Sequence, residues 1–401
     1  MKRYIFLTTT VRNVGGAQLY ISRKKEWLES LGWVVDVYFY NEGDVKIQGL
    51  KKYQSNCIKE LSLPHYVLNT TCLNKIADKL RSVSKEIYTI IESHTINLTL
   101  IGEEIAKIIN AKHLAYWLSE SFPAECLRYK NFFERKLEDN SLFGITDRSI
   151  PDFLGYNNLT KNRGLLAVGC FQSIVENIEF PFINNIKPVS YNILCLGRLD
   201  KPYVEYMITK IIVFVRKYIN KDFNLIFVGS SADISIETRI KDRISVLSNV
   251  NSYFLGYMFP IPKQLLQIAD VVISSSGSAL VAYRENIKTI TIDANDWEPL
   301  GVLGFTTKNV LFRENEPKQK LEDLLENILI ENKYTIKNKK YDIPIVDNLD
   351  YTQHQKVIDL VINSKCYDIS YSKTLKEKIL YLLSFMCGTK VLIKIFSMKT
   401  K

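Results

Sequence analysis

Short apolar runs alternate with amphipathic stretches along the first third of the chain. The apolar run 4–9 predicts a buried strand, and 17–31 predicts a helix with leucines on one side and the basic residues 23–25 on another. Gly32 ends this helix, and the β-branched and aromatic run 33–40 predicts a second strand. A strand, a helix and a strand in this order indicate a parallel sheet with helices on its faces.

The alternation continues and then restarts in the second half of the chain. A first series ends with predicted strands at 87–91 and 113–118, on either side of a predicted helix at 98–109. A second series begins near Tyr191, after the irregular stretch 157–190, which is rich in Asn, Gly and Pro. Its predicted strands are 193–196, 224–228, 252–255, 271–273 and 289–292, and its predicted helices are 203–218 and 262–268.

This order of elements predicts an α/β protein with two Rossmann-like, doubly wound domains that face a central cleft. We expect the first domain at 1–180, the second at 190–345, and C-terminal helices at 346–401. Ligands bind such sheets at the carboxyl ends of strands, so the loops that follow the predicted strands are the ones to inspect for chemistry.

Composition supports a globular protein of two domains. The chain has 401 residues, of which 46% are hydrophobic and 24% charged. Its seven cysteines are widely spaced without a C-x-x-C pair, so we expect no disulfide framework and no zinc site, and reduced thiols in a cytoplasmic protein. The four histidines have no metal-ligand spacing either. The first apolar run is too short for a signal peptide.

The C-terminal tail carries most of the excess positive charge. The formal net charge is +10, and the last 30 residues hold seven lysines and one acid, Glu377, which gives this segment a charge of +6. The rest of the chain is nearly balanced and has no nucleic-acid-binding motif, so nucleic acid is not an expected partner.

The same tail is rich in apolar residues. Gly388, Lys390 and Lys394 interrupt them, which argues against a transmembrane span. Lysines and apolar side chains together favour binding to anionic lipid, so we expect residues 373–401 to lie on an anionic membrane surface. The alternative is a C-terminal helix that packs on the protein itself.

Two loops that follow predicted strands combine glycine with groups that suit a phosphate. Gly15 and Gly16 let the backbone approach a ligand at the start of a helix, although a tight turn explains them equally well. Arg198 and Lys201 suit a pyrophosphate, because arginine binds it with two hydrogen bonds and lysine adds a point charge. The alternative is a solvated surface pair that bonds to Asp200.

Further candidates follow three other predicted strands. The loop containing Ser276, Gly277 and Ser278 offers hydroxyls and backbone N–H groups to a phosphate or a ribose, although one of its serines can simply cap the next helix. His94 can bond a sugar hydroxyl or stabilise developing charge, and a histidine bonded to nearby backbone is the alternative. Glu120 is a candidate general base, as one acid among 43.

The motifs resemble, in order and approximate spacing over residues 3–330, those of bacterial GT-B glycosyltransferases, most closely glycosyltransferase family 4 and its relatives. The matching segments are 15–18 with 31–37 (GGAQ and the helix end), 196–201 (G-R-L-x-x-x-K), 225–229 (a strand ending in V-G), 253–257 (V-x-F-L-G-Y) and 268–274 (x-A-D-V-x-V-x-P-S).

This resemblance implies a nucleotide-sugar donor that is bound mainly by the second domain. It places Arg198 and Lys201 on the diphosphate, and Gly256 at the donor. It places Gly16 near the donor phosphate or the acceptor, and His94 at the position of the family's active-site histidine. Because the two cations replace a metal in such enzymes, the resemblance implies no cofactor and no metal.

The sequence also departs from the family pattern. No acid stands at 273–281, where the Glu-x7-Glu motif is expected, and Glu285 lies outside the pattern as a surface residue. Lys201 follows Arg198 by three positions, where five is commoner. The motif is therefore degenerate, retaining stereochemistry does not carry over, and the Ser-Gly-Ser loop is closer to that of some inverting GT-B enzymes.

These observations lead to one main hypothesis and two alternatives. The main hypothesis is a glycosyltransferase on the inner face of the cell membrane, which moves a sugar from a nucleotide-diphosphate sugar to a hydroxyl of a growing, lipid-linked glycan. Bacterial surface polysaccharide synthesis, such as that of lipopolysaccharide or capsule, fits this activity by type. The first alternative is a non-catalytic GT-B subunit of a transferase complex, and the second is a nucleotide-sugar epimerase.

Overall fold

The structure, a computed structural model of the whole chain, divides into two compact units. The first unit contains Met1–Cys170 and Asp350–Lys401, and the second contains Phe171–Leu349. The C-terminal segment, expected as a separate part at 346–401, thus belongs to the first unit, because its last helix packs on that unit's core. The described residues are 2–12, 15–81, 88–118, 124–145, 149–155, 164–166, 175–231, 233–335, 339–343 and 351–398.

Five parallel strands form the sheet of the first unit, in the order β2-β1-β3-β4-β5. Their apolar residues are buried on both faces of the sheet, as in sheets that are covered by helices on both sides. The chain runs from β1 outward to β2 and then returns to β3 on the other side of β1. The carboxyl ends of β1 and β3 therefore form the switch point of this sheet, the usual place for a ligand. The strands are β1 (Lys2–Leu7), β2 (Trp33–Tyr38), β3 (Tyr88–Ser93), β4 (Lys112–Trp117) and β5 (Leu142–Gly144).

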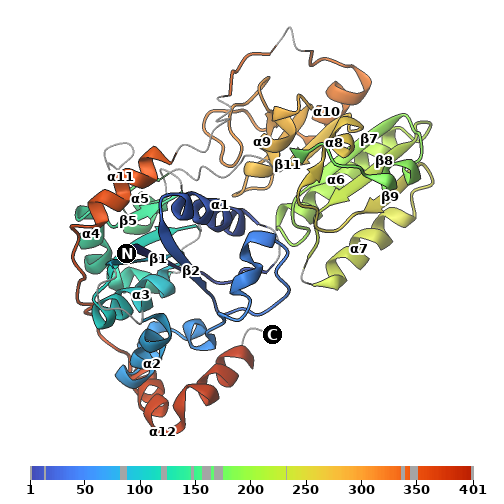
Figure 1. Cartoon of the computed structure of the whole chain (residues 1–401). Helices are drawn as coiled ribbons and strands as arrows, with labels where there is room; N and C mark the ends of the chain where they lie inside the picture. Colours follow the sequence, from blue (N-terminus) through green and yellow to red (C-terminus); the bar gives the residue numbers. More distant parts are fainter. Residues whose placement is uncertain are drawn as a thin grey trace. The chain divides into compact units, whose positions relative to one another are not determined.

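Helices cover both faces of this sheet (Figure 1). Helix α1 lies on one face, where Tyr20 reaches β3, and α11 packs beside it through the stacked rings of Trp27 and Tyr351. Helices α2, α3 and α4 bury their apolar sides on the other face. The helices are α1 (Gly16–Ser30), α2 (Thr70–Leu80), α3 (Ile96–Ile109), α4 (Lys130–Glu138), α5 (Ser149–Leu154) and α11 (Thr352–Val361), with short 3-10 turns η1 (Gln48–Tyr53), η2 (Lys59–Ser62), η3 (His65–Val67) and η4 (Ala124–Tyr129).

The last helix, α12 (Leu375–Met398), bends at Gly388, whose φ of 71° is left-handed. Beyond the bend, Leu392 is completely buried in the core shared with α2 and α3. Before the bend, Ser384 accepts a hydrogen bond from the Asn69 side chain at 2.9 Å, and Glu377 pairs with Arg128 at 2.5 Å. Leu380 and Leu383 before the bend, and Ile393 beyond it, lie against the same core. The tail therefore packs on the first unit through polar and apolar contacts before the bend and through apolar contacts beyond it.

The second unit has a six-stranded sheet in the order β13-β12-β11-β7-β8-β9. All neighbours in it are parallel except β13, which pairs with β12 in the antiparallel direction. The chain leaves β7 toward β8 and returns to β11 on the other side of β7. The switch point of this sheet therefore lies at the carboxyl ends of β7 and β11. The strands are β7 (Tyr191–Leu196), β8 (Phe223–Val228), β9 (Val250–Phe254), β11 (Val271–Ser274), β12 (Thr289–Ile292) and β13 (Pro299–Val302), with a small separate pair, β6 (Val175–Glu176) and β10 (Ile261–Pro262).

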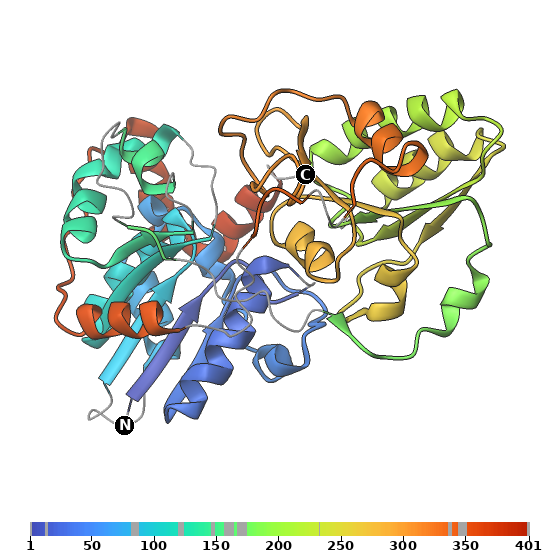
Figure 2. The same cartoon turned by 90° about the horizontal axis from the view of Figure 1, so that it is seen from above.

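The helices of the second unit also lie on both faces of its sheet (Figure 2). Helices α6, α7 and α10 bury their apolar sides on one face, and α8 and α9 on the other. These elements confirm the expected α/β class with largely parallel sheets. The helices are α6 (Tyr203–Lys217), α7 (Ile234–Ser245), α8 (Lys263–Gln267), α9 (Gly277–Arg284) and α10 (Leu321–Leu325), with the short turns η5 (Pro181–Asn185) and η6 (Glu326–Ile330).

Candidate functional site

His94 and the glycine pair lie at the switch point of the first unit. His94 directly follows β3, and its backbone N–H donates to the carbonyl of Leu7, the last residue of β1, at 3.1 Å. Gly16 begins α1 at the end of the loop after β1, and a Cβ added to it would meet no atom within 4 Å. A ligand can therefore approach the backbone there. A Cβ on Gly15 would lie 2.8 Å from the side-chain oxygen of Gln18, which is the movable end of a flexible side chain, and the φ of Gly15 is an ordinary extended −151°, so the turn itself does not require a glycine there.

A buried charged network lies directly beneath His94. Glu92 is completely buried, and its side chain accepts from the Nε2 atom of His94 at 2.8 Å. Tyr4 donates to Glu92 from β1 at 2.5 Å, and Tyr20 donates from α1 at 2.8 Å. Lys24, also on α1, contacts the carboxylate at 2.5 Å and is completely buried. The expectation that residues 23–25 lie together on a polar side of the helix is therefore wrong for Lys24.

The buried charges keep Glu92 ionised. Burial alone raises the pKa of Glu92, but the charge of Lys24 and the hydrogen bond from His94 outweigh burial and hold that pKa well below its usual range. Burial lowers the pKa of Lys24, and the charge of Glu92 opposes this. An ion pair that is buried and fully hydrogen-bonded fixes how α1 sits on the sheet, because losing either partner leaves a buried charge without compensation.

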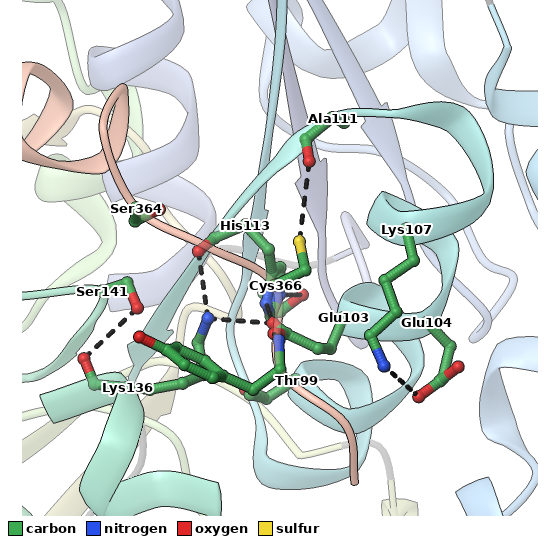
Figure 3. A network of polar contacts seen from close by, with 12 residues as sticks. Thr99, Glu103, Glu104, Lys107, Ala111, His113, Lys136, Ser141, Ser364 and Cys366 are labelled. Atoms are coloured by element: carbon green, nitrogen blue, oxygen red, sulfur yellow. Dashed lines mark hydrogen bonds and ion pairs between the residues drawn. The ribbon is translucent and has the colours of Figure 1, made fainter. Parts of the chain in front are cut away.

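A second buried network lies on the opposite face of β3, which it contacts through Ser93. Figure 3 shows its central residues, Glu103, His113 and Lys136. Glu103 on α3 accepts from Nδ1 of His113 at 2.5 Å and from Lys136 at 2.9 Å. The other ring nitrogen of His113 bonds the hydroxyl of Ser93 at 2.9 Å. Burial raises the pKa of Glu103, but Lys136 and His113 lower it to about 2. This network also accepts the backbone N–H of Tyr367, so it secures the segment that leads to α12.

The basic loop follows β7 in the second unit. Its first residue, Gly197, donates to the carbonyl of Val228 at 2.9 Å and has a left-handed φ of 143°. Arg198 is 54% exposed and lies 3.4 Å from Asp200, which is a loose ion pair. Lys201 lies 5.6 Å from the centre of the Tyr203 ring. The two cations thus stand at the end of β7, and the guanidinium of Arg198 is accessible to a ligand.

The serine loop after β11 lies next to the basic loop. Ser274, the last residue of β11, donates its hydroxyl to the carbonyl of Leu196 at 2.6 Å, which ties the ends of β11 and β7 together. Ser276 has the strained backbone angles φ 60° and ψ −141°, and α9 begins at Gly277. No described side chain caps that helix, so Ser276 does not act as the cap that was the alternative for it. Strained residues of this kind cluster at ligand sites. With Ser278, this loop faces the same switch point with backbone N–H groups that suit an anion.

Gly256 supports the basic loop from behind. Its carbonyl accepts the backbone N–H of Gly229 at 2.8 Å, and its φ of 68° is left-handed. A Cβ on Gly229 would lie 2.0 Å from the carbonyl oxygen of Gly197. The backbones of the loops after β7, β8 and β9 therefore pack in direct contact. The role of Gly256 at the donor stays a prediction, and the contacts described here give it a structural one.

Two acidic residues that the sequence analysis considered are not part of the sites described above. Glu120 lies outside the described residues. Glu285 ends α9 and pairs with Lys263 at 3.1 Å, so it is a surface ion pair, as the sequence suggested. Among the described residues, no three or more His, Cys, Asp or Glu side chains gather as metal ligands would.

Sequence reasoning missed Lys24, Tyr4, Tyr20 and Glu92. One sequence signal was available for Glu92. It stands two positions before His94, and alternate residues of a strand share one face.

The chain matches no family model and no curated protein sequence. Solved structures with the same fold cover nearly all of it. HepE from Anabaena, in complex with UDP-glucose, has 15% sequence identity and a TM-score of 0.57 over 90% of this chain and 97% of its own. A glycosyltransferase from Rickettsia africae has 13% identity and a TM-score of 0.57 over 98% of each chain. A sucrose-phosphate synthase from Thermosynechococcus elongatus has 12% identity and a TM-score of 0.52 over 98% of this chain and 99% of its own.

These likenesses extend over both units of the chain, and each unit contains a largely parallel, doubly wound sheet. The chain therefore has the GT-B fold, as the sequence motifs indicated.

Proposed function

We propose that this protein transfers a sugar from a nucleoside-diphosphate sugar to a hydroxyl group of a glycan. The observation that carries the proposal is the convergence of two loops at the switch point of the second unit. There the exposed guanidinium of Arg198 follows β7, and the uncapped start of α9 follows β11. A hydrogen bond from the Ser274 hydroxyl to the Leu196 carbonyl joins the ends of these two strands. A GT-B fold with a cationic and an N–H-rich loop at that point suits a diphosphate.

The cations of the basic loop supply the chemistry of donor binding and departure. Arg198 binds the diphosphate with paired hydrogen bonds, and Lys201 adds a second positive charge. As the bond to the sugar breaks, negative charge grows on the leaving nucleoside diphosphate, and both cations stabilise it. Transfer by this route takes no metal ion. The loop of Ser276, Gly277 and Ser278 binds phosphate or ribose through backbone N–H groups and hydroxyls.

The first unit contributes the remaining candidates. His94 bonds a substrate hydroxyl at the end of β3, and Gly16 leaves room beside it for the acceptor or a phosphate. Glu120 is the proposed general base that takes the proton of the attacking hydroxyl. HepE was crystallised with UDP-glucose, so a uracil nucleotide is the first donor to test.

The nucleotide proposal is tested by thermal unfolding with UDP, GDP, ADP and UDP-glucose. A ligand at one hundred times its dissociation constant adds about 2.7 kcal/mol to the stability of the native state. We expect one nucleotide to raise the unfolding temperature of the wild type, and Arg198→Ala to lose most of that rise. Arg239→Ala is the matched control, because Arg239 is an equally exposed arginine of the second unit that pairs with Glu205 on its surface. A rise that survives in Arg198→Ala contradicts the assignment of the diphosphate site.

A non-catalytic GT-B subunit is the second candidate function. The observation that favours it is the missing acid pair: the only acid near the expected motif, Glu285, is held by Lys263 on the surface. Release of the nucleoside diphosphate from its sugar by the purified protein excludes this candidate. Tight nucleotide binding without any turnover supports it.

We also propose that α12 holds the protein on the inner face of the cell membrane, close to a lipid-linked acceptor in surface polysaccharide synthesis. By length and composition, Leu375–Phe396 is the one described helix able to cross a membrane. Its polar residues Glu377 and Ser384 are buried against the protein, while a stripe of apolar side chains before the bend is exposed. The outward stripe has helical spacing and consists of Leu375, Ile379, Leu382 and Met386, with Phe385 beside it.

Lysines border this stripe. Lys376, Lys378, Lys390 and Lys394 are all exposed, which suits an anionic lipid surface. Sedimentation with phosphatidylserine vesicles is expected to remove the wild type from solution, and Leu382→Asp with Met386→Asp to restore it. Val213→Asp, at an exposed apolar position of the second unit, is the control. Release of the wild type by high salt separates surface binding from a spanning helix, because only surface binding depends on the lysines.

A further inference from the structure

The side chain of Glu92 has no free hydrogen-bonding position. One oxygen accepts from the Tyr20 hydroxyl and from His94 Nε2, both at 2.8 Å. The other oxygen accepts from the Tyr4 hydroxyl and from Lys24 Nζ, both at 2.5 Å. A carboxylate has about four lone-pair positions and, when ionised, no proton to donate. All four partners of Glu92 must therefore be donors.

This requirement settles which ring nitrogen of His94 carries the proton. Nε2 faces an acceptor, so it carries the hydrogen, and in the neutral ring Nδ1 is left with a lone pair. Lys24 already balances the charge of Glu92, so the network does not need a charged histidine. The Nδ1 atom is buried and has no hydrogen-bond partner among the described residues. Leaving such a buried acceptor unpaired is unfavourable, and a hydroxyl of a bound ligand would supply the missing hydrogen bond.

We propose that Glu92 and Lys24 are positioning residues that hold His94 in the Nε2–H form, so that Nδ1 accepts a hydrogen bond from a hydroxyl of the transferred sugar. The position supports this role, because His94 stands at the switch point between β1 and β3. The sugar contact rests on the proposed function, whereas the form of the ring does not. Tyr4, Tyr20 and Lys24 bring the network together from β1 and α1, and the rings of Phe6 and Tyr20 flank His94 at 5.8 Å.

The sharpest variant is Glu92→Gln, which keeps the shape and replaces one acceptor by a donor. Lys24 and Tyr4 both donate to the same oxygen, so the amide oxygen of Gln takes that place. The amide NH2 then faces His94, whose Nε2 must become the acceptor, and the proton moves to Nδ1. The network thus predicts that one isosteric substitution switches the histidine tautomer and removes the acceptor.

Glu103→Gln is a matched control on the other face of the sheet. Glu103 is equally buried and also joins a lysine, Lys136, to a histidine, His113. Both substitutions disturb a buried ion pair in the same unit, so both lower its stability. Only Glu92→Gln is expected to change the ring of His94.

The experiment is a long-range 1H–15N spectrum of protein with labelled histidine, in which the four histidines are assigned by substitution. We expect Nε2–H for His94 in the wild type and in Glu103→Gln, and Nδ1–H in Glu92→Gln. A wild-type His94 with its proton on Nδ1 overturns the proposal even if Glu92→Gln does not fold. A Glu92→Gln spectrum that still shows Nε2–H overturns it as well.

Ligand titration tests the sugar contact separately. UDP-glucose is expected to shift the Nδ1 resonance of the wild type, and UDP, which lacks the sugar, to leave it unchanged. If UDP-glucose binds without moving Nδ1, the hydroxyl contact is wrong. If neither compound binds, the proposed donor is wrong, while the tautomer result stands on its own. In Glu92→Gln we expect turnover to fall at least tenfold with little change in UDP affinity, because UDP lacks the sugar hydroxyl that Nδ1 is proposed to bind.

Discussion

At the scale of single residues, the candidate site of the first unit depends on two carboxylates that are buried and paired, Glu92 and Glu103. Glu92 and Glu103 lie on opposite faces of the same sheet, and each joins a lysine to a histidine. A buried ion pair adds little net stability, but it penalises every arrangement that separates its partners. The two networks thus fix β3 between α1 and α3, and with it the backbone that carries Ser93 and His94.

The first prediction concerns the glycine contact behind the basic loop. In Gly229→Ala, the new methyl group would meet the carbonyl of Gly197 at 2.0 Å, so the backbone next to Arg198 has to move. We expect nucleotide affinity to fall at least tenfold, and stability to fall by about 1–3 kcal/mol. Gly32→Ala is the control, because Gly32 also has a left-handed φ but open space around its Cβ. Calorimetric titration with UDP measures the affinity, and unchanged binding in Gly229→Ala contradicts the role of this contact.

At the scale of elements, apolar runs predicted strands well where neighbours on both faces are apolar. Strand β12 was expected at 289–292 and is found there, and α1 begins and ends one residue before the expected limits. Strand β3 was expected to end at Ile91 but continues through Ser93, because buried Glu92 and Ser93 find polar partners. Those partners lie far away in the chain, so no local pattern shows them.

The candidate sites, too, could be predicted from the sequence only in part. That the basic loop and the serine loop follow strands was readable, because each stands next to a short apolar run. That the two loops are neighbours depends on the order β11-β7, which a single sequence does not contain. Lys24 was placed with its basic neighbours because its partner, Glu92, is 68 positions away. Sequence periodicity assigns a face to a residue, whereas the partner across the core decides whether a charge can be buried there.

The second prediction concerns the anchor of α12. Arg128 pairs with Glu377 at the start of the helix, and its guanidinium lies 4.9 to 5.3 Å from the ring centres of Tyr66, Tyr129 and Tyr371. We expect Arg128→Ala to loosen α12, at a cost of about 1–2 kcal/mol, because the ion pair and the ring contacts are lost together. Limited trypsin digestion should then cut at the lysines of the tail several times faster than in the wild type.

Arg81→Ala is the control for this experiment. Arg81 forms an exposed ion pair with Asp78, and such pairs contribute little. Equal digestion of the tail in wild type and Arg128→Ala shows that the apolar contacts of α12 with the core, such as that of Leu392, are enough to hold the helix. Vesicle binding by the same variants then shows whether the protein docks with α12 fixed or released.

At the scale of the whole molecule, the two units repeat one plan but differ in their titratable groups. Each has a largely parallel sheet in which the chain moves outward from the first strand and then returns to that strand's other side, at β1–β3 and at β7–β11. All four histidines, however, belong to the first unit. Its buried ion pairs have no counterpart of similar burial among the ion pairs described in the second unit. Mild acid should therefore act on the two units unequally.

The third prediction follows from His113 and His65. Burial is the main cause that lowers the pKa of both to about 4, with Lys136 adding to it at His113 and Lys373 at His65. Between pH 6.5 and 4, the unfolded chain binds protons that the folded first unit does not, so stability falls as pH falls through this range. For His113 the loss is about 2 kcal/mol at pH 5, and His65 acts in the same direction. Below about pH 4.5, protonation of Glu103 in the unfolded chain adds a further loss.

Hydrogen exchange followed by mass spectrometry at pH 7 and pH 5, corrected for intrinsic rates, reports both units in one sample. Protection should fall in β3, β4 and α3 while β7, β8 and α6 keep theirs, and His113→Asn should reduce the difference. Equal losses in both units would mean that the acid response comes from general charge repulsion and not from the buried histidines.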